Sequence, residues 1–292
     1  MGAFGDYQAI GQSRMKFAVL SHAVSDNIGN EIQSVAAEML LPRVDMRIPI
    51  TEMSTYRGEQ TLLVMNSFFS ERAALPPSPN ITPLYIAFYM GSAAQRKYAT
   101  AECIEHFKRH QPIGCRDKVS VRFFHDLGIE AYYSGCLTLT MPLRESAGLH
   151  NYAVDYPRRN NYFRGEMYGK RECISVSHKH NFAPLGGDIT FQMARNLLAL
   201  YRSAEHIYTS RLHCALPCSA MGIPVTYLGV REGRTDCLLE LGERLELPLL
   251  KWRYALNNPD LIHVKLDQDK VQEHKRRLVD NFNQRLQSLL NR

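Results

Sequence analysis

Three polar side chains lie close together within residues 208–219, which read Tyr-Thr-Ser-Arg-Leu-His-Cys-Ala-Leu-Pro-Cys-Ser. Ser210, Arg211 and His213 follow a short apolar strand pattern and precede a helix of small residues. Open α/β sheets bind ligands at such corners, because backbone N–H groups and the helix dipole favour an anion. Arginine binds carboxylate or phosphate, and histidine moves a proton near neutral pH. The pattern predicts an anion site with a proton donor; the alternative is a capped helix with a solvated arginine and a structural histidine.

The corner belongs to an alternation of strands and helices that continues along the chain. Apolar runs and periodic patterns predict strands at residues 16–21, 61–65, 84–89, 113–115, 130–133, 137–140, 172–177, 206–208 and 224–228. Helices are predicted at residues 31–41, 94–110, 117–127, 189–203 and 267–290, and between the last two strands. This alternation favours parallel sheets covered on both faces.

We therefore predict an α/β fold with two Rossmann-like domains that face each other across a cleft. The predicted domains are residues 1–155, on the acceptor side, and residues 156–292, on the donor side, with the last helix closing the structure. The division falls within residues 144–170, where polar, aromatic and arginine residues interleave without an apolar period. Residues 1–15 are predicted to be a loosely ordered leader.

Composition narrows the class of protein. The 292 residues include 45% hydrophobic and 22% charged residues, with a net charge of +6, as in ordinary globular proteins. This mild charge suits anionic small molecules or an anionic membrane surface and does not require nucleic acid. Seven scattered cysteines without a CxxC pair predict neither a disulfide framework nor a thiolate zinc site. Without a signal peptide or a long apolar run, the cytoplasm is the expected location, including the inner face of the membrane.

Three motifs, in this order, give the chain a family resemblance. They are residues 26–31 (Asp-Asn-Ile-Gly-Asn-Glu), residues 113–117 (Ile-Gly-Cys-Arg-Asp), and residues 209–213 (Thr-Ser-Arg-Leu-His) followed by Gly-Ile-Pro-Val at 222–225. The chain resembles the polysaccharide pyruvyl transferase family. The resemblance implies a fold like that of GT-B glycosyltransferases and transfer of a pyruvyl group from phosphoenolpyruvate to two hydroxyls of a sugar, giving a cyclic ketal. It also implies that Arg211 and His213 bind phosphoenolpyruvate and that the histidine acts as general acid.

The chemistry of that reaction assigns roles on the donor side. Protonating the methylene carbon of phosphoenolpyruvate creates an oxocarbenium-like centre, so the site needs a proton donor and cations for carboxylate and phosphate. We predict His213 as the donor, Arg211 as the carboxylate ligand and the Ser210 helix start as a phosphate ligand. The predicted donor-binding set is Ser210, Arg211, Leu212, His213, His178 and Lys179, with no metal and no cofactor besides phosphoenolpyruvate as co-substrate.

The acceptor side is expected to hold a saccharide. Its predicted ligands are Asp26, Asn27, Asn30, Glu31 and Arg116. Asp26 is a candidate base for a sugar hydroxyl, although Asp26 or Asn27 capping the helix is an equal alternative. Arg116 faces the cleft in one interpretation; in the other, Asp117 caps a helix and pairs locally.

The chain departs from the family pattern at two places. Asn30 stands where family members often carry aspartate, and the loop at residues 177–180 (Ser-His-Lys-His) has no arginine after the first strand of the second domain. Lys179 supplies charge there but not a planar fork, and His178 and His180 are either anion contacts or a solvated pair. A GT-B-type glycosyltransferase using a nucleotide sugar, or a glycan-binding relative without a donor site, therefore remain alternatives. Membrane contact through the last helix is open, and the sequence does not predict the oligomeric state.

Overall fold

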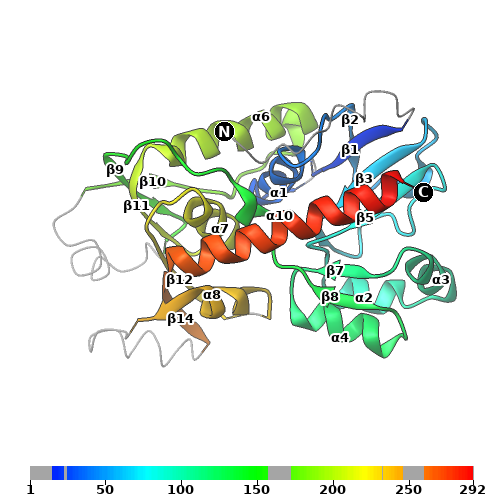
Figure 1. Cartoon of the computed structure of the whole chain (residues 1–292). Helices are drawn as coiled ribbons and strands as arrows, with labels where there is room; N and C mark the ends of the chain where they lie inside the picture. Colours follow the sequence, from blue (N-terminus) through cyan, green and yellow to red (C-terminus); the bar gives the residue numbers. More distant parts are fainter. Residues whose placement is uncertain (1–14, 23–24, 157–171, 232, 246–259, 292) are drawn as a thin grey trace.

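The computed structural model describes residues 15–22, 25–156, 172–231, 233–245 and 260–291. Most of the predicted leader and residues 157–170 of the predicted inter-domain segment lie outside these ranges. Figure 1 shows two separate sheets, with helices around and between them.

The first sheet is fully parallel, with strand order β2-β1-β3-β5. Its strands are β1 (Lys16–Ser21), β2 (Met46–Pro49), β3 (Thr61–Met65) and β5 (Ile81–Tyr85). Both faces of β1 are buried, since Phe17 and Val19 join one hydrophobic cluster and Ala18 and Leu20 another. This burial explains why the strand reads as a continuous apolar run.

Small elements cover the second of these faces. Two short parallel pairs form there, β4 (Phe68–Phe69) with β6 (Tyr89–Met90), and β7 (Ile113–Cys115) with β8 (Ala131–Tyr133). The helices are α2 (Ser92–Tyr98), α3 (Ala101–Arg109) and α4 (Lys118–Asp126). The prediction of one helix over residues 94–110 is wrong, because Thr100 starts a new helix by accepting a hydrogen bond from the N–H of Cys103.

The second sheet is mixed, with order β10-β9-β11-β12-β14-β13. Its strands are β9 (His150–Val154), β10 (Cys173–Val176), β11 (Ala204–Thr209), β12 (Val225–Val230), β13 (Gly242–Arg244) and β14 (Leu261–Leu266). Strands β10 to β12 are parallel, whereas β14 runs antiparallel to β12 and to β13. The expectation of a purely parallel sheet therefore fails at this edge.

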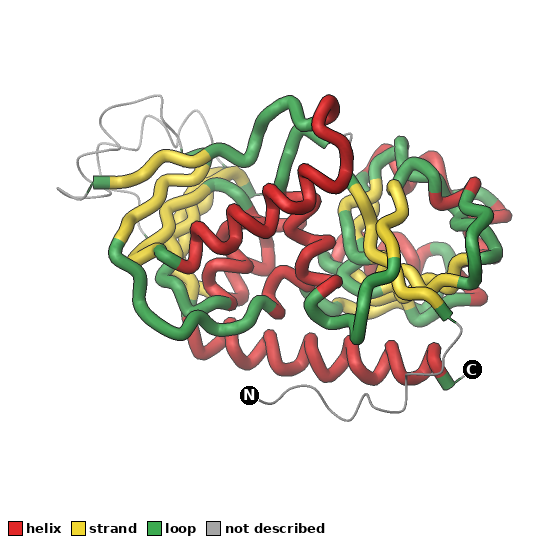
Figure 2. The backbone as a smooth tube through the Cα atoms, turned by 90° about the horizontal axis from the view of Figure 1, so that it is seen from above, coloured by secondary structure: helices red, strands yellow, loops and turns green. Residues whose placement is uncertain are grey.

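A layer of helices separates the two sheets in Figure 2. It contains α1 (Gly29–Glu38), α6 (Gly186–Arg202) and α7 (Leu212–Ala220), which contact one another. One hydrophobic cluster runs from Phe17 on β1 through Leu216 on α7 to Val225 on β12. The predicted α/β class with parallel strands is therefore confirmed.

Residues 137–140, predicted as a strand, form the buried 3-10 helix η3 (Leu137–Thr140). The alternation of Leu and Thr resembles a strand pattern, but the Thr140 hydroxyl donates to the Leu137 carbonyl at 2.7 Å and closes a local turn. The other 3-10 helices are η2 (Met53–Thr55), η4 (Ala183–Leu185) and η5 (Gly233–Thr235), the last followed by α8 (Asp236–Leu241).

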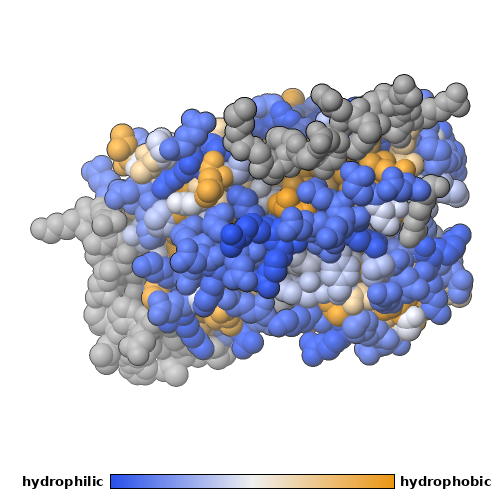
Figure 3. Space-filling model, in the orientation of Figure 1, coloured by the Kyte–Doolittle hydropathy of each residue, from blue (hydrophilic) through white to orange (hydrophobic). Residues whose placement is uncertain are grey.

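The helix α10 (Gln268–Leu290) follows the second sheet and returns along the first. The sequence predicts an apolar stripe on this helix formed by Val271, Leu278, Phe282, Leu286 and Leu289. The first four are buried, and Leu289 is partly buried against the same core. The face of the molecule that carries α10 is predominantly hydrophilic in Figure 3. Among the described helices, none is both long and apolar enough to cross a membrane.

Candidate active site

The corner between β11 and α7 has the strand-to-helix geometry that the sequence predicts. Arg211 occupies the N-cap position, with extended backbone angles, and its N–H donates to Thr209 Oγ1 at 2.9 Å. The Ser210 hydroxyl donates to the Asp155 carbonyl at 2.6 Å, and Leu212 is buried. His213 lies in the first turn with non-helical backbone angles, φ −82° and ψ 18°.

Arg211 forms an ion pair that the sequence analysis missed. Its Nε lies 2.7 Å from Oδ2 of Asp155, and the two side chains are 28% and 14% exposed. Neither Nη group of Arg211 has a hydrogen bond to another described residue. Among the described residues, Asp155 therefore contacts the Arg211 guanidinium at Nε alone.

Asp155 also organises the loop after β10. It accepts hydrogen bonds from the Ser177 hydroxyl at 2.7 Å and the His178 N–H at 2.9 Å. Burial by itself raises the pKa of Asp155, but these hydrogen bonds and Arg211 outweigh burial and lower the pKa below its ordinary value. The carboxylate therefore stays ionised and joins three loops at the carboxyl end of the second sheet.

His213 turns away from this ion pair toward the first sheet. Its Nε2 lies 3.0 Å from Nη1 of Arg116, and the same Nη1 donates to Gln33 Oε1 at 2.6 Å. An arginine has five donors and no acceptor. Nε2 of His213 must therefore accept this hydrogen bond, so the neutral ring carries its proton on Nδ1.

Gly29, at the start of α1, lies against the other side of the same ring. A Cβ placed on Gly29 would be 3.2 Å from the His213 Cβ and 3.4 Å from Nδ1. These contacts are tighter than ordinary van der Waals packing, so a side chain at residue 29 would push the two helix starts apart by a few tenths of an ångström. The first and third motifs, which are far apart in the sequence, therefore meet at His213.

A buried polar network extends from Arg116 into the first sheet. Gln33 Nε2 and Ser67 Oγ are 3.4 Å apart, and Ser67 Oγ lies 3.0 Å from His22 Nε2. All four side chains are at most 5% exposed. Burial lowers the pKa of His22 to about 4, so the ring is neutral at physiological pH.

Glu31 lies beside this network as a buried carboxyl group. Its Oε1 accepts a hydrogen bond from the His22 N–H at 2.6 Å, and Oε2 has no hydrogen-bond partner among the described residues. Burial raises the pKa of Glu31 to about 7, against opposing contributions from His22, Arg47 and Thr190. Glu31 thus has a proton affinity suited to acid–base chemistry near neutral pH.

The remaining predicted acceptor ligands lie in the loop before α1. The N-cap position of α1 is Ile28, so neither Asp26 nor Asn27 is the N-cap residue. Asn27 Oδ1 accepts from the N–H of Gly29, the first residue of α1, at 3.0 Å, whereas the Asp26 side chain is exposed. Asn30 donates to Ser25 Oγ at 2.8 Å. This loop pairs with the loop after β10, since the Ile28 N–H donates to the His178 carbonyl at 3.0 Å.

Two predicted donor ligands in that second loop differ sharply in exposure. The ring of His178 is fully buried and its Nε2 lies 2.7 Å from the Tyr201 hydroxyl, so a bound donor would contact it only after the ring moved. Lys179 is exposed, and its backbone forms a bridge with Asn27.

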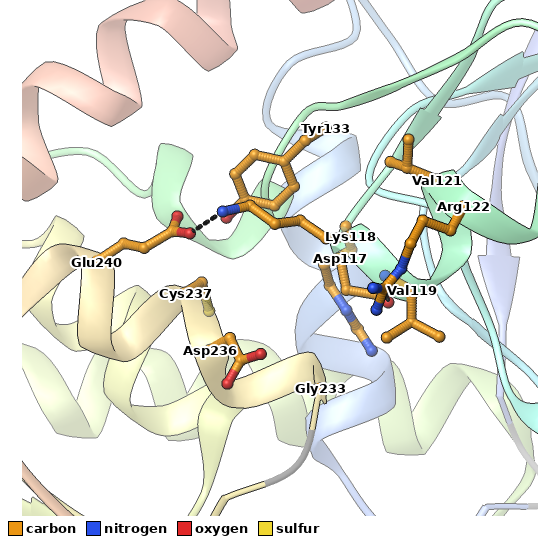
Figure 4. A pocket seen from close by; sticks show the side chains of 11 residues that line it. Asp117, Lys118, Val119, Val121, Arg122, Tyr133, Gly233, Asp236, Cys237 and Glu240 are labelled. Atoms are coloured by element: carbon orange, nitrogen blue, oxygen red, sulfur yellow. Dashed lines mark hydrogen bonds and ion pairs between the residues drawn. The ribbon is translucent and has the colours of Figure 1, made fainter. Parts of the chain in front are cut away.

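A pocket of about 490 Å³ opens between α4 and α8 beside Arg116. Asp117 caps α4 by accepting from the N–H groups of Val119 and Ser120, both at 2.9 Å, so the capping alternative is confirmed for this residue. Figure 4 shows Lys118 reaching from α4 toward Glu240 on α8, with the Tyr133 ring beside it. The pocket thus has one wall from each half of the chain.

The structure therefore brings together His213, Arg116 and the start of α1, and separately Arg211, Ser210 and Asp155. Sequence reasoning missed Asp155, His22, Gln33 and Ser67. Asp155 and His22 each directly follow a strand, which is the signal that finds ligands at the carboxyl edge of a sheet. Among the described residues, no cluster of three or more His, Cys, Asp or Glu side chains is placed to hold a metal ion.

Comparison with known proteins bears on the motifs described above. A family model described as polysaccharide pyruvyl transferase matches residues 90–232, which include Arg116 and residues 209–213 but not the loop before α1. Among solved structures, an uncharacterized protein from Klebsiella pneumoniae is similar, with 11% identity, a TM-score of 0.41, and coverage of 72% of this chain and 82% of that chain. No curated protein matches. Residues 90–232 thus match the polysaccharide pyruvyl transferase family, as the motifs predict, and the match identifies this chain as a transferase.

Proposed function

We propose that this protein transfers the pyruvyl group of phosphoenolpyruvate to two hydroxyls of a sugar in a glycan or glycan precursor, forming a cyclic ketal. The observation that carries the proposal is the family match, because it spans the corner that bears Arg211 and His213. The match implies a saccharide acceptor; the donor and the ketal product are our inference.

In the proposed reaction, His213 protonates the methylene carbon of phosphoenolpyruvate, and a first sugar hydroxyl attacks the adjacent carbon. Loss of inorganic phosphate and attack by a second hydroxyl then close the ketal, and each hydroxyl releases one proton. Because Nε2 accepts a hydrogen bond from Arg116, the ring must exchange that bond for a proton on Nε2 before it acts as an acid. An anionic donor beside the ring favours that protonation.

The two Nη groups of Arg211, which have no hydrogen bond to another described residue, suit the donor carboxylate, since Asp155 bonds to Nε. The hydrogen of the Ser210 hydroxyl already bonds to the Asp155 carbonyl, so Ser210 would donate to the donor phosphate only after that bond breaks. Glu31, with its pKa raised to about 7, is the candidate to accept a proton from a sugar hydroxyl. Asn30 and Arg116 are the other acceptor-side candidates.

We further propose a GT-B-like arrangement in which each sheet belongs to a Rossmann-like domain, with the division between residues 155 and 156. One strand qualifies this division, because β9 precedes it but pairs with β10 and β11. A cytoplasmic site of action, with phosphoenolpyruvate as co-substrate and no metal, completes the proposal.

A direct test measures phosphate release from phosphoenolpyruvate with β-galactoside and N-acetylmannosamine acceptors. Thermal melting with phosphoenolpyruvate, and separately with UDP, GDP and CMP compounds, identifies the donor class. A ligand at 100 times its Kd stabilises a protein by about 2.7 kcal/mol, which is readily measured. We expect stabilisation by phosphoenolpyruvate; stabilisation by nucleotides alone would replace the proposal with a nucleotide-sugar transferase.

A further inference from the structure

Within the part of the chain that the structure describes, the guanidinium of Arg116 forms hydrogen bonds through one nitrogen, Nη1. Nη1 donates to both Gln33 and His213, whereas Nε and Nη2 are buried and have no hydrogen-bond partner among the described residues. The side chain is 1% exposed, and one face of the guanidinium lies 4.7 Å from the centre of the Tyr89 ring. Buried charged donors are almost always paired, so two unpaired nitrogens on one side chain require an explanation.

The two unpaired nitrogens form one edge of the guanidinium. Nε and Nη2 point in the same direction, with the spacing that matches the two oxygens of a carboxylate or phosphate. Nη1 fixes the plane of the group, because both of its hydrogens are already directed at Gln33 and His213. The edge is therefore held in one orientation before any ligand arrives.

The surroundings of this edge are suited to an anion. Arg116 lines the pocket between α4 and α8. The acidic residues of that pocket already have partners: Asp117 caps α4, Glu240 pairs with Lys118 at 2.5 Å, and Asp236 pairs with Arg231 at 2.9 Å. The pocket thus contains a buried guanidinium edge and no carboxylate that is left to pair with it among the described residues.

We propose that the Nε–Nη2 edge of Arg116 is an oxyanion subsite that binds a phosphate or carboxylate group from the α4–α8 pocket. Because the two nitrogens are buried, the ligand reaches them after small shifts of exposed pocket side chains such as Lys118 and Val119. The site differs from the Arg211–Asp155 corner, which uses another arginine on another loop.

The subsite has a consequence that rests on the proposed function. Nη1 of the same guanidinium bonds Nε2 of His213, so an anion on the opposite edge places negative charge one side chain away from the ring. This charge offsets that of Arg116 and lowers the cost of a positive charge on the ring. The added proton takes the place of the Nη1–Nε2 hydrogen bond, so the acid forms only when Nη1 separates from Nε2.

The test is a titration of the whole protein, labelled with 15N-arginine, with inorganic phosphate. We expect the Arg116 Nε–H resonance to shift and saturate, which requires no variant. Arg116→Lys keeps the charge but removes the edge, and should weaken phosphate binding about tenfold or more. Arg122→Gln removes an exposed cation of the same pocket and should leave binding within about twofold.

Two further titrations identify the source of the oxyanion. Phosphoenolpyruvate and UDP are each added to the phosphate complex. Displacement by phosphoenolpyruvate assigns the subsite to the pyruvyl donor. Displacement by UDP assigns it to a diphosphate group, carried by a diphosphate-linked acceptor or by a nucleotide-sugar donor. An Arg116 Nε–H that does not respond to phosphate, or equal weakening by the two variants, would overturn the subsite. The titration measures binding and not turnover, so its result is independent of the phosphate-release assay. A protein that fails that assay but still binds phosphate at Arg116 would contradict pyruvyl transfer and leave the subsite standing.

Discussion

At the carboxyl end of the first sheet, His22, Gln33 and Arg116 are almost fully buried and are linked by hydrogen bonds through Ser67. Asp155 and Arg211 at the second sheet are partly exposed. The first group depends on hydrogen bonds in a water-poor interior, where an unpaired group is costly. The second depends on one ion pair that water and salt can reach. His213 follows directly from the second corner but bonds into the first group. Under the proposed function, the buried region sets the protonation state of the His213 ring, and the exposed corner receives the donor carboxylate.

The largest expected effect is on catalysis, at the residue that links the two regions. His213→Ala should lower the rate of phosphate release from phosphoenolpyruvate by about 10²–10⁴, the usual contribution of a positioned acid. Folding should remain near normal by circular dichroism. His150→Ala, which removes an exposed histidine on β9, serves as the control. Full activity of the His213 variant would remove the proposed acid.

The next effect is on the pH dependence of stability, and it arises from Glu31 in the buried region. In the folded protein Glu31 holds its proton up to about pH 7, whereas its ordinary pKa is 4.5. Between these values the folded state binds more protons than the unfolded state. The contribution of neutral Glu31 to the unfolding free energy is therefore fully present below pH 4.5. As the pH rises to about 7, the unfolding free energy falls by roughly 3 kcal/mol.

Glu31→Gln stays neutral and should not show this loss. The difference in unfolding free energy between variant and natural protein should rise by about 3 kcal/mol, in favour of the variant, between pH 4.5 and 7.5. Urea denaturation at several pH values measures it. His22, whose pKa is lowered to about 4, changes stability in the opposite direction, but it does so in both proteins and cancels. If the difference in unfolding free energy between the two proteins does not change with pH, folding does not raise the pKa of Glu31.

The smallest effect belongs to the exposed corner. Arg211→Lys keeps the charge and loses the planar fork, so we expect the KM for phosphoenolpyruvate to rise about tenfold, with a stability change below about 1 kcal/mol because the ion pair is partly exposed. Arg195→Lys, at another ion pair with Glu38, is the matched control. An unchanged KM would exclude Arg211 from donor binding.

Much of the fold follows from local patterns. The strands β1, β3 and β7 have the predicted bounds because each is a short apolar run, and α10 follows its apolar stripe. The strand β9 was missed, since its residues lie in a polar and aromatic stretch and only its pairing with β10 and β11 makes it a strand. Such pairing depends on distant residues, which a local pattern does not report.

In the candidate site, too, local features were predicted and long-range contacts were missed. The strand-to-helix corner at Ser210 is a local feature and was predicted from its residues. The partners of Arg211 and His213 were not, because Asp155 is 56 residues from the first and Arg116 is 97 residues from the second. Whether a polar residue binds a ligand or a neighbour depends on contacts of this range, so the roles of the predicted ligands stay predictions.

The path of α10 has a consequence for synthesis on the ribosome. Although the strands of the first sheet are made early, the Arg285 side chain donates to the Pro112 carbonyl at 2.9 Å, and Asn281 accepts from the Tyr132 hydroxyl at 2.7 Å. These contacts wait until residues 268–290 have left the exit tunnel. The early half of the nascent chain therefore exposes the apolar surface that Phe282 and Leu286 later cover, and during that interval it is open to chaperones.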